Sequence, residues 1–373
     1  MAKLGEVCKV SPSTKNIERQ GAWLLNLDMV EQQTGRVIEY KYVGEDDLNG
    51  SIIQFDTENV LYSKLRPNLN KVVLPQKDGF STSELLPLRP DAGVLNRDYL
   101  AAFLRSDSFV TWAVSKTAGA KMPRLGTKDL MNAEIPVPNI EQQKTIAEKF
   151  KKLEQLISLR KQQLEKLDEL VKARFVEMFG DLDSRPKQKI KDITKRVKVG
   201  FVGTCEKYYT SNSEVPMLRT TNITAHGIDL KDLKYVTREF HEKNPKSQVH
   251  AGDLLIARHG ANGQANAYYG REAQCLNAII IEPDINITNS IFLEYLINSI
   301  DVKSQINKKL VGSTQHVLNT TTLANVEVSI PEMREQQTFS AFVERVNQQK
   351  QTVQQSLEKL ELIKKALMQE YFG

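Results

Sequence analysis

The most restrictive feature of this 373-residue sequence is an internal repeat. Leu164-Glu-Lys-Leu167 recurs as Leu357-Glu-Lys-Leu360 at an offset of 193 residues. Glu141-Gln-Gln recurs as Glu335-Gln-Gln at an offset of 194 residues, so we expect one single-residue insertion between the halves. A repeat of this length predicts a fold made of two equivalent modules, each large enough to bury its own core.

The repeat extends beyond this stretch but not through the whole of each half. Lys3-Leu-Gly-Glu-Val7 matches Lys189-Ile-Lys-Asp-Ile193 at an offset of 186 residues, and 59–65 resembles 253–259 as the same buried strand. Elsewhere the halves differ, which fits either an old duplication that drifted or two equivalent modules that recognise different things. The further matches at the 193-residue offset pair Gly119, Leu125, Leu130, Glu134 and Pro138 with Gly312, Leu318, Leu323, Glu327 and Pro331.

Each half ends in a predicted long helix with a coiled-coil seam. Apolar residues recur at alternating spacings of four and three, the 3.5-residue period of a coiled coil. Each helix follows a proline, Pro138 or Pro331, and ends at a glycine, Gly180 or Gly373. About 38 residues at about 1.5 Å each give a rod of roughly 57 Å. The seam residues are Ile146, Phe150, Leu153, Ile157, Leu164, Leu167, Val171 and Met178, then Phe339, Val343, Val346, Val353, Leu357, Leu360, Leu367 and Tyr371.

The expected fold is therefore α+β, with two globular heads separated by two long antiparallel coiled-coil helices and an internal pseudo-twofold repeat. The alternative is that each helix packs only on its own head. Within the heads, 52–55, 71–74 and 277–281 look like strands, whereas 98–109 and 291–306 look helical. The expected boundaries are 1–137 for the first head, 138–181 for the first helix, 182–330 for the second head and 331–373 for the second helix.

Polar loops in both heads are candidates for recognising DNA. Arg and Lys match the acceptors of guanine, and Asn and Gln match adenine. The same residue types are also ordinary in solvated turns, and this alternative stays open. The candidates are Lys64, Arg66, Asn68, Asn70, Lys71, Lys121 and Arg124 in the first head, and Arg219, Arg258, His259, Asn262, Gln264, Asn266, Arg271, Gln315 and His316 in the second.

Composition and motifs disfavour catalysis by this chain. No GxxxxGK[ST] phosphate loop occurs, and the halves share no Ser/His/Asp or Cys/His set, so we expect no enzyme active site. The three cysteines and five histidines lack zinc-ligand spacing, and no metal is expected. No apolar run approaches the roughly 20 residues of a membrane span, and we expect a cytoplasmic protein. The net charge of +5 permits a polyanionic partner without requiring one.

These features resemble the specificity subunit of Type I restriction-modification systems. A proline, Glu-Gln-Gln and a coiled coil ending in Phe-Gly follow a variable domain twice, although the second Glu-Gln-Gln comes one residue later after its proline. Asn59 to Pro67 with Ser81-Thr-Ser-Glu84 is similar to one type of target recognition domain, and Ala251-Gly-Asp-Leu-Leu255 with Leu276-Asn277 is similar to another.

The resemblance implies a DNA-binding, non-catalytic subunit that recognises a bipartite, gapped double-stranded site. It implies two methyltransferase subunits that use S-adenosylmethionine to methylate adenine at N6, with no cofactor in this chain. Restriction subunits that translocate and cleave with ATP and Mg²⁺ would complete a cleaving complex. Two alternatives remain open: a related system in which one partner both methylates and cleaves, and a coiled-coil adaptor that does not bind DNA.

Overall fold

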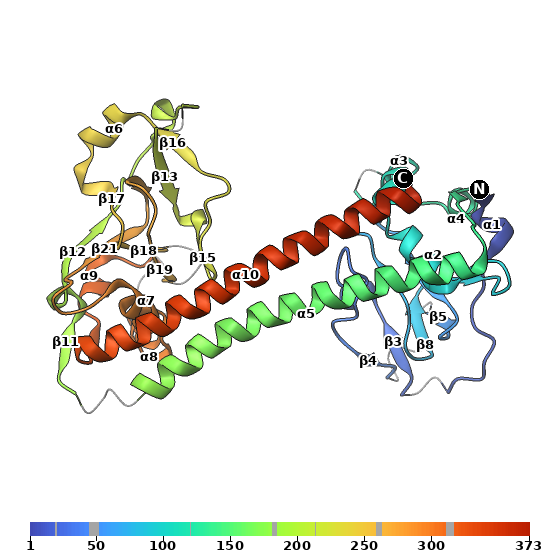
Figure 1. Cartoon of the computed structure of the whole chain (residues 1–373), viewed down its shortest axis with the longest axis horizontal. Helices are drawn as coiled ribbons and strands as arrows, with labels where there is room; N and C mark the ends of the chain where they lie inside the picture. The colour runs from blue at the N-terminus through green and yellow to red at the C-terminus, as the bar shows by residue number, and fades with distance from the viewer. Residues whose placement is uncertain are drawn as a thin grey trace. The chain divides into compact units, whose positions relative to one another are not determined.

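A computed structural model describes residues 1–18, 21–44, 52–119, 121–180, 185–212, 214–258, 263–310 and 317–373. The chain forms two compact units (Figure 1). The first contains Met1–Gln162 and Val353–Gly373, and the second contains Gln163–Thr352. Each unit therefore joins one head to one half of each long helix.

The first head consists mainly of a run of short strands followed by three short helices. Arg97–Leu104 begins at Asn96, whose side chain accepts a hydrogen bond from Tyr99 N, and Asp107–Ser115 begins at Ser106, which caps Phe109 N in the same way. The elements are β1 Ala2–Lys3, α1 Leu4–Val7, β2 Cys8–Val10, β3 Trp23–Leu25, β4 Lys41–Tyr42, β5 Ile52–Phe55, β6 Val60–Ser63, β7 Val72–Val73, β8 Gly79–Thr82, β9 Leu85–Pro90, α2 Arg97–Leu104, α3 Asp107–Ser115, α4 Thr127–Met131 and β10 Glu134–Ile135.

The described part of the second head has the same order of strands, with an additional hairpin, β14 and β15, and an additional helix, α6. Its elements are β11 Lys187–Lys189, β12 Thr194–Val199, β13 Val215–Arg219, β14 Ile223–Thr224, β15 Gly227–Ile228, β16 Lys234–Val236, α6 Arg238–Lys243, β17 Gln248–Val249, β18 Leu254–Ile256, β19 Ala265–Ala267, β20 Ala273–Leu276, β21 Ile279–Pro283, α7 Ser290–Asn298, α8 Ile300–Leu310, α9 Thr320–Ala324 and β22 Glu327–Ser329.

Sheet topology repeats between the heads, which confirms the internal repeat. One four-stranded sheet has the order β2-β9-β6-β7 in the first head and β12-β21-β18-β19 in the second. The other has the order β4-β3-β8-β5, matched by β16-β13-β20-β17, and in each the central pair is parallel. The two runs predicted to be the same buried strand, 59–65 and 253–259, contain β6 and β18, which take the same place in matching sheets.

The strand predictions at 52–55, 71–74 and 277–281 correspond to β5, β7 and β21, although β7 is shorter and β21 begins two residues later. The two helical predictions are wrong in one respect, because each run is two helices. A serine starts the second helix in both heads: Ser106 caps Phe109 N, and Ser299 accepts a hydrogen bond from Val302 N. A capping hydroxyl satisfies an amide that a continuous helix would have satisfied, so the chain can turn there.

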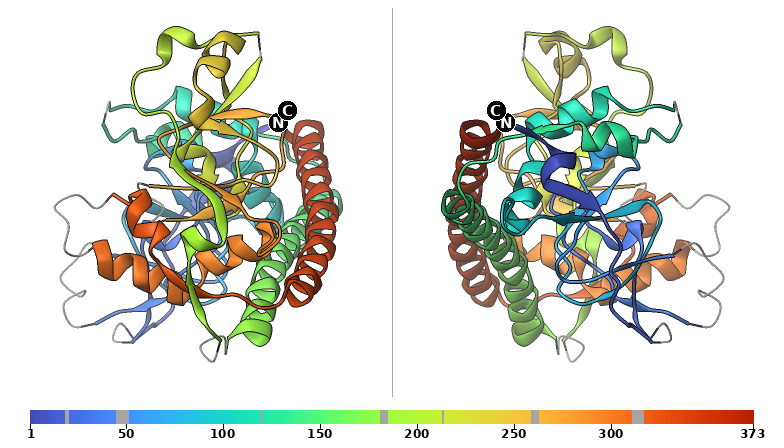
Figure 2. Two further views of the ribbon diagram at one scale, coloured as in Figure 1. Left: turned by 90° about the vertical axis from the view of Figure 1, so that its left-hand side faces the viewer. Right: turned by 90° about the vertical axis from the view of Figure 1, so that its right-hand side faces the viewer.

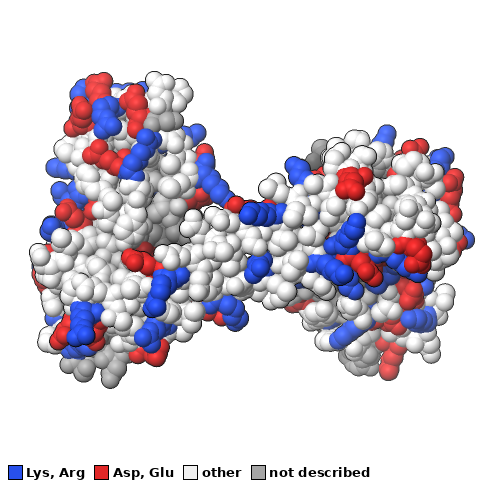
Figure 3. All heavy atoms as spheres, in the orientation of Figure 1, with Lys and Arg blue, Asp and Glu red and all other residues white. Residues whose placement is uncertain are grey.

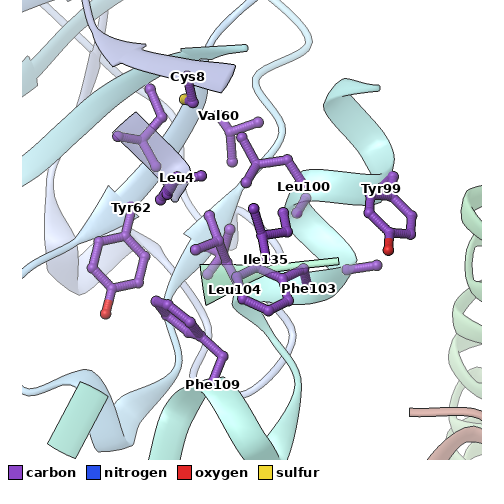
Figure 4. Packing of buried hydrophobic residues seen from close by; sticks show 14 of the residues in the cluster. Leu4, Cys8, Val60, Tyr62, Tyr99, Leu100, Phe103, Leu104, Phe109 and Ile135 are labelled. Carbon is purple, nitrogen blue, oxygen red and sulfur yellow. The ribbon is translucent and has the colours of Figure 1, made fainter. Parts of the chain in front are cut away.

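The core of the first unit joins the head to the helix ends. Figure 4 shows Leu4, Val60, Leu100, Phe103 and Ile135 converging from different elements of the head. Ile146 and Phe150 from the first long helix and Met368 and Phe372 from the second belong to the same cluster. The second unit repeats this arrangement with Phe175, Phe179, Phe339 and Val343. The helix ends are therefore part of each hydrophobic core.

The long helices are α5 Ile140–Phe179 and α10 Met333–Phe372, each of 40 residues. They lie side by side in both units (Figures 1 and 2). In the first unit Lys149 Nζ donates to Tyr371 Oη at 2.8 Å, and Lys364 Nζ lies 3.0 Å from Glu154 Oε1, so the numbering runs in opposite directions. In the second unit Phe175 packs on Phe339. All sixteen predicted seam residues are buried or half-buried.

One expectation about the repeat is wrong, because the two Glu-Gln-Gln runs do not correspond residue by residue. Gln143 Nε2 donates to Pro138 O and Val94 O, and its Oε1 accepts from Asn96 N. Gln336 makes the same three bonds at the 193-residue offset, with Pro331 O, Ile287 O and Asn289 N. The second glutamine of one run thus matches the first of the other, and no insertion is needed between the halves there.

Two features are absent from the described part of the chain. No helix there is long and apolar enough to cross a membrane. No group of three or more His, Cys, Asp or Glu side chains is placed there to hold a metal ion.

Candidate nucleic-acid interface

The first hairpin loop, residues 64–71, connects β6 to β7 and carries five of the candidate residues. Arg66 and Asn70 both have a φ of 49°, the left-handed conformation that non-glycine residues rarely adopt. Arg66 N donates to Pro123 O at 2.8 Å, and Asn70 N donates to Pro67 O at 2.9 Å. Strain held by surrounding contacts is typical of functional loops.

A second segment of the first head, 117–125, lies against this hairpin loop. Leu125 N donates to Lys64 O at 2.9 Å, and Arg124 exchanges two backbone hydrogen bonds with Ala118. The Arg124 side chain pairs with Glu84 at 3.2 Å and is about half exposed. The structure therefore brings the two candidate loops of the first head together.

The side chains in these loops divide into two groups. Arg66, Asn68 and Lys121 are exposed, Lys64 is half-buried, and none of the four side chains has a hydrogen bond or ion pair with a described residue. These four are free to meet a ligand.

Asn70 and Lys71 instead point into the head. Asn70 is buried, and its Nδ2 donates to Arg105 O at 3.0 Å. Lys71 Nζ donates to Leu27 O at 2.6 Å, and burial lowers the pKa of its ammonium. Their positions favour a structural role over base recognition.

Arg258 occupies the place in the second head that Lys64 has in the first. Leu318 N donates to Arg258 O at 3.2 Å, as Leu125 N does to Lys64 O. The guanidinium of Arg258 donates to Leu318 O at 3.1 Å and to Asn277 Oδ1 at 2.9 Å. Arg258 is thus held between two segments of its own head.

The other candidates of the second head are spread over several sites. Gln264 is half-buried, and Asn266 is buried, with its Nδ2 donating to Thr224 O at 2.8 Å. Arg219 pairs with Asp232 at 3.2 Å, and Arg271 lies over the ring of Tyr235. His259, Asn262, Gln315 and His316 lie outside the described residues.

Sequence reasoning missed the residues that support these loops. Glu84 accepts a backbone hydrogen bond from Lys64 and pairs with Arg124. Asn277, at the position matching Glu84, has a φ of 55° and holds Arg258. Gln33 Nε2 donates to Asn68 O at 3.0 Å from a segment 35 residues earlier. Because these contacts join residues that are far apart in sequence, no local pattern could have indicated them.

A groove of about 1160 Å³ lies within the second unit, between the head and the halves of α5 and α10 that belong to this unit. Glu294 lines it, and its Oε2 accepts from Ala267 N at 2.8 Å. Burial raises the pKa of Glu294 to about 7. Lys303 donates to Gly263 O near the same wall, and burial lowers the pKa of Lys303 to about 8.

Basic and acidic side chains alternate on the face of each unit that Figure 3 shows. No broad basic surface marks that face. Contacts to DNA phosphates there would depend on individual Lys and Arg residues.

The family model for the Type I restriction modification DNA specificity domain matches residues 1–169 and again residues 188–362. Curated relatives include the Type I restriction enzyme EcoDI specificity subunit of Escherichia coli, 26% identical over 33% of this chain and 27% of that protein. The MjaVIII specificity subunit of Methanocaldococcus jannaschii is 23% identical over 81% of this chain and 75% of that protein. The shared region with EcoDI is thus about a quarter of that relative.

Solved structures agree in fold. The Type-I restriction-modification system S subunit from M. genitalium gives a TM-score of 0.59 at 14% identity, over 100% of this chain and 95% of that one. A chain from a study of complex assembly and conformational transition of the type I R-M system also gives 0.59, at 15% identity, over 100% and 96%.

Two heads that share a fold but differ in sequence, each joined to a pair of long helices, define a duplicated two-domain protein. The chain belongs to the family of Type I restriction-modification DNA specificity domains and contains its domain twice. It is a specificity subunit, the recognition component and not the catalyst, as the family resemblance in the sequence predicted.

Proposed function

We propose that this chain selects a bipartite, gapped site in double-stranded DNA for a methyltransferase complex. Residues 1–137 would recognise one half-site and residues 182–330 the other, while 138–181 and 331–373 would space them. The observation that carries this proposal is that the two heads share a backbone fold but have different polar residues at matching loop positions. Lys64 and Arg258 make the same backbone contact in the two heads, and Glu84 corresponds to Asn277.

Such an exchange suits two different half-sites. An unpaired Lys or Arg can donate to guanine O6 and N7, whereas Asn and Gln match adenine. In the first head the free side chains are Lys64, Arg66, Asn68 and Lys121. Two domains with the same backbone fold but different polar side chains in their loops would recognise two different short DNA sequences.

The partners follow from the same proposal. Two methyltransferase subunits would bind the helices and methylate adenine at N6 with S-adenosylmethionine, which this chain would not bind. Restriction subunits that use ATP and Mg²⁺ would join in a system that also cleaves. The exposed apolar side chains Leu156, Leu159, Leu362 and Ile363 on the long helices offer a surface for such a partner.

Mapping N6-methyladenine tests the proposal. DNA from cells that express this chain with its candidate methyltransferase would be compared with DNA from cells that lack this chain. We expect a gapped two-part motif that disappears without the chain. Unchanged methylation with a verified complex would contradict the proposal and favour the coiled-coil adaptor.

Arg66→Ala tests which loop reads the first half-site. The arginine is exposed and without a described partner, so its loss should weaken binding to the cognate first half-site by about 1 to 3 kcal/mol if it contacts a base. Binding to duplexes with single changes in that half-site would be measured by titration. Equal weakening on every duplex would assign Arg66 to a phosphate.

A further inference from the structure

Arg105 binds the end of the first hairpin loop and the strand that follows it. It caps the C-terminus of α2, and its side chain is only 8% exposed. Its backbone oxygen accepts from Asn70 Nδ2 at 3.0 Å, and its Nη2 and Nε donate to Val72 O at 2.7 and 3.3 Å. One residue thus holds both the last turn of the loop and the first residue of β7.

The other edge of the Arg105 guanidinium reaches the long helices. Nη1 donates to Glu154 Oε2 on α5 at 3.1 Å, and Glu154 Oε1 accepts from Lys364 Nζ on α10 at 3.0 Å. Burial raises the pKa of Glu154, but Arg105 and Lys364 outweigh it and hold the pKa below its usual value. The carboxylate is therefore charged at neutral pH, when charge-assisted hydrogen bonds are strongest.

The segment that contains Gly35 packs against Val72 and Arg105 as well. Gly35 has a φ of 68°, and a Cβ there would lie 1.7 Å from Val72 O and 2.8 Å from Arg105 Nη2. Only glycine lets this segment approach so closely. Gln33, two residues earlier, then reaches Asn68 O in the hairpin loop.

In the second head, the residue that matches Arg105 binds the strand but makes no hydrogen bond to the long helices among the described residues. Asn298 lies at the 193-residue offset from Arg105, and Ala265 at that offset from Val72. Asn298 Oδ1 accepts from Ala265 N at 3.0 Å, and its Nδ2 donates to Ala265 O at 2.7 Å. Both polar atoms of this short side chain are used in these two bonds, and Asn298 is one of the residues that line the groove.

We infer that Arg105 is a positioning residue that couples the first hairpin loop to the paired helices through Glu154 and Lys364. This inference rests on the proposed function. The first half-site is then read in a fixed position relative to the spacer. Asn298, the matching residue of the second head, makes no such bond to either long helix among the described residues, so the two half-sites differ in how strictly the spacer controls them.

The test uses the whole methyltransferase complex and a set of duplexes. The duplexes carry the mapped motif, the motif with its gap changed by one base pair, and the motif with one change in either half-site. Arg105→Asn copies the second head and removes the reach to Glu154. Glu154→Gln keeps the shape of the carboxylate but removes its charge. Lys166→Asn breaks an exposed ion pair with Glu169 on the same helix and is the matched control.

We expect both test variants to lower the preference for the native gap, and for the native first half-site, by about tenfold, because small misplacements are costly in assembled sites. Selectivity at the second half-site should stay within about twofold, and Lys166→Asn should resemble the unchanged chain. Thermal unfolding of each complex measures how much folded protein is present.

A purely structural role for Arg105 predicts a different result. Methylation would then fall equally on all duplexes, in proportion to the unfolded fraction, and the gap preference would be unchanged. That result in Glu154→Gln would overturn the inference even if Arg105→Asn fails to fold. If the unchanged complex shows no gapped motif at all, the proposed function itself fails, which is a distinguishable outcome.

Discussion

At the scale of single residues, the two heads share a buried glutamine at each helix entrance, whereas exposed loop positions differ. Gln143 and Gln336 are fully buried and make identical bonds at the helix entrances. A buried amide that loses its partners costs free energy, so such positions tolerate little change. Exposed loop positions such as Arg66 and Asn68 carry no such restriction and can diverge.

Gln336→Ala should destabilise the chain much more than Gln337→Ala. The first substitution leaves Asn289 N, Ile287 O and Pro331 O without their partner inside the head, at a cost of about 2 to 4 kcal/mol. The side chain of Gln337 is exposed and makes no hydrogen bond with a described residue. Denaturant unfolding measures the loss of stability in each of the two variants. Equal effects would show that the register of the repeat proposed for these glutamines is wrong.

Glu294 should make stability depend on pH. Its carboxyl has an ordinary pKa of 4.5 in the unfolded chain and about 7 in the folded one, so the folded chain holds one more proton between these values. The free energy of unfolding therefore falls as pH rises from about 4.5 to 7, by about 3 kcal/mol, and is constant above.

Glu294→Gln should remove this dependence, because an amide accepts from Ala267 N without ionising. Relative to the unchanged chain, the variant should gain stability at pH 8 and not at pH 4.5. Chemical denaturation at several pH values measures the difference. Glu344→Gln, an exposed carboxylate lining the same groove, is the control, and a gain of equal size there would contradict the role of burial.

At the scale of elements, periodicity predicted the long helices well because an apolar seam is a local pattern. Both begin two residues after a proline and end before a glycine. The seam did not reveal that Phe175, Phe179 and Phe372 also join the cores of the heads.

Strands were predicted from apolar runs, but their pairing was not. The parallel contact of β3 with β8 joins residues more than 50 apart, and no local pattern encodes it. For the same reason, composition picked out the loops around Arg66 and Lys121 but could not separate inward Asn70 and Lys71 from outward Arg66 and Asn68.

The outward faces of the helices give a prediction at this scale. Leu159 of α5 and Leu362 of α10 are 59% and 68% exposed. Leu159→Glu with Leu362→Glu should leave folding unchanged within about 0.5 kcal/mol but weaken binding of the methyltransferase partner at least tenfold.

Binding would be measured by titration of purified partner, with thermal unfolding of the lone chain alongside. Val114→Glu, an exposed apolar position on α3 that is 41% exposed, serves as the control away from the long helices. Unchanged partner binding in the double variant would remove this surface from the proposal.

At the scale of the whole molecule, the repeat and the helix pair suggest that the spacer sets the gap. Inserting seven residues at Leu164 of α5 and seven at Ser356 of α10 keeps both seams in phase, because seven residues are one full heptad. Each helix grows by about 10 Å, which corresponds to about three base pairs of B-DNA.

We expect both half-sites to stay the same while the gap in the methylated motif grows by about three base pairs, as a map of N6-methyladenine would show. Insertion into α5 alone makes the two paired helices unequal in length. It should reduce methylation without producing a motif with a new gap. The two outcomes separate a spacer that measures distance from helices that only hold the heads together. An altered half-site with an unchanged gap would mean that the heads, and not the helices, set the spacing.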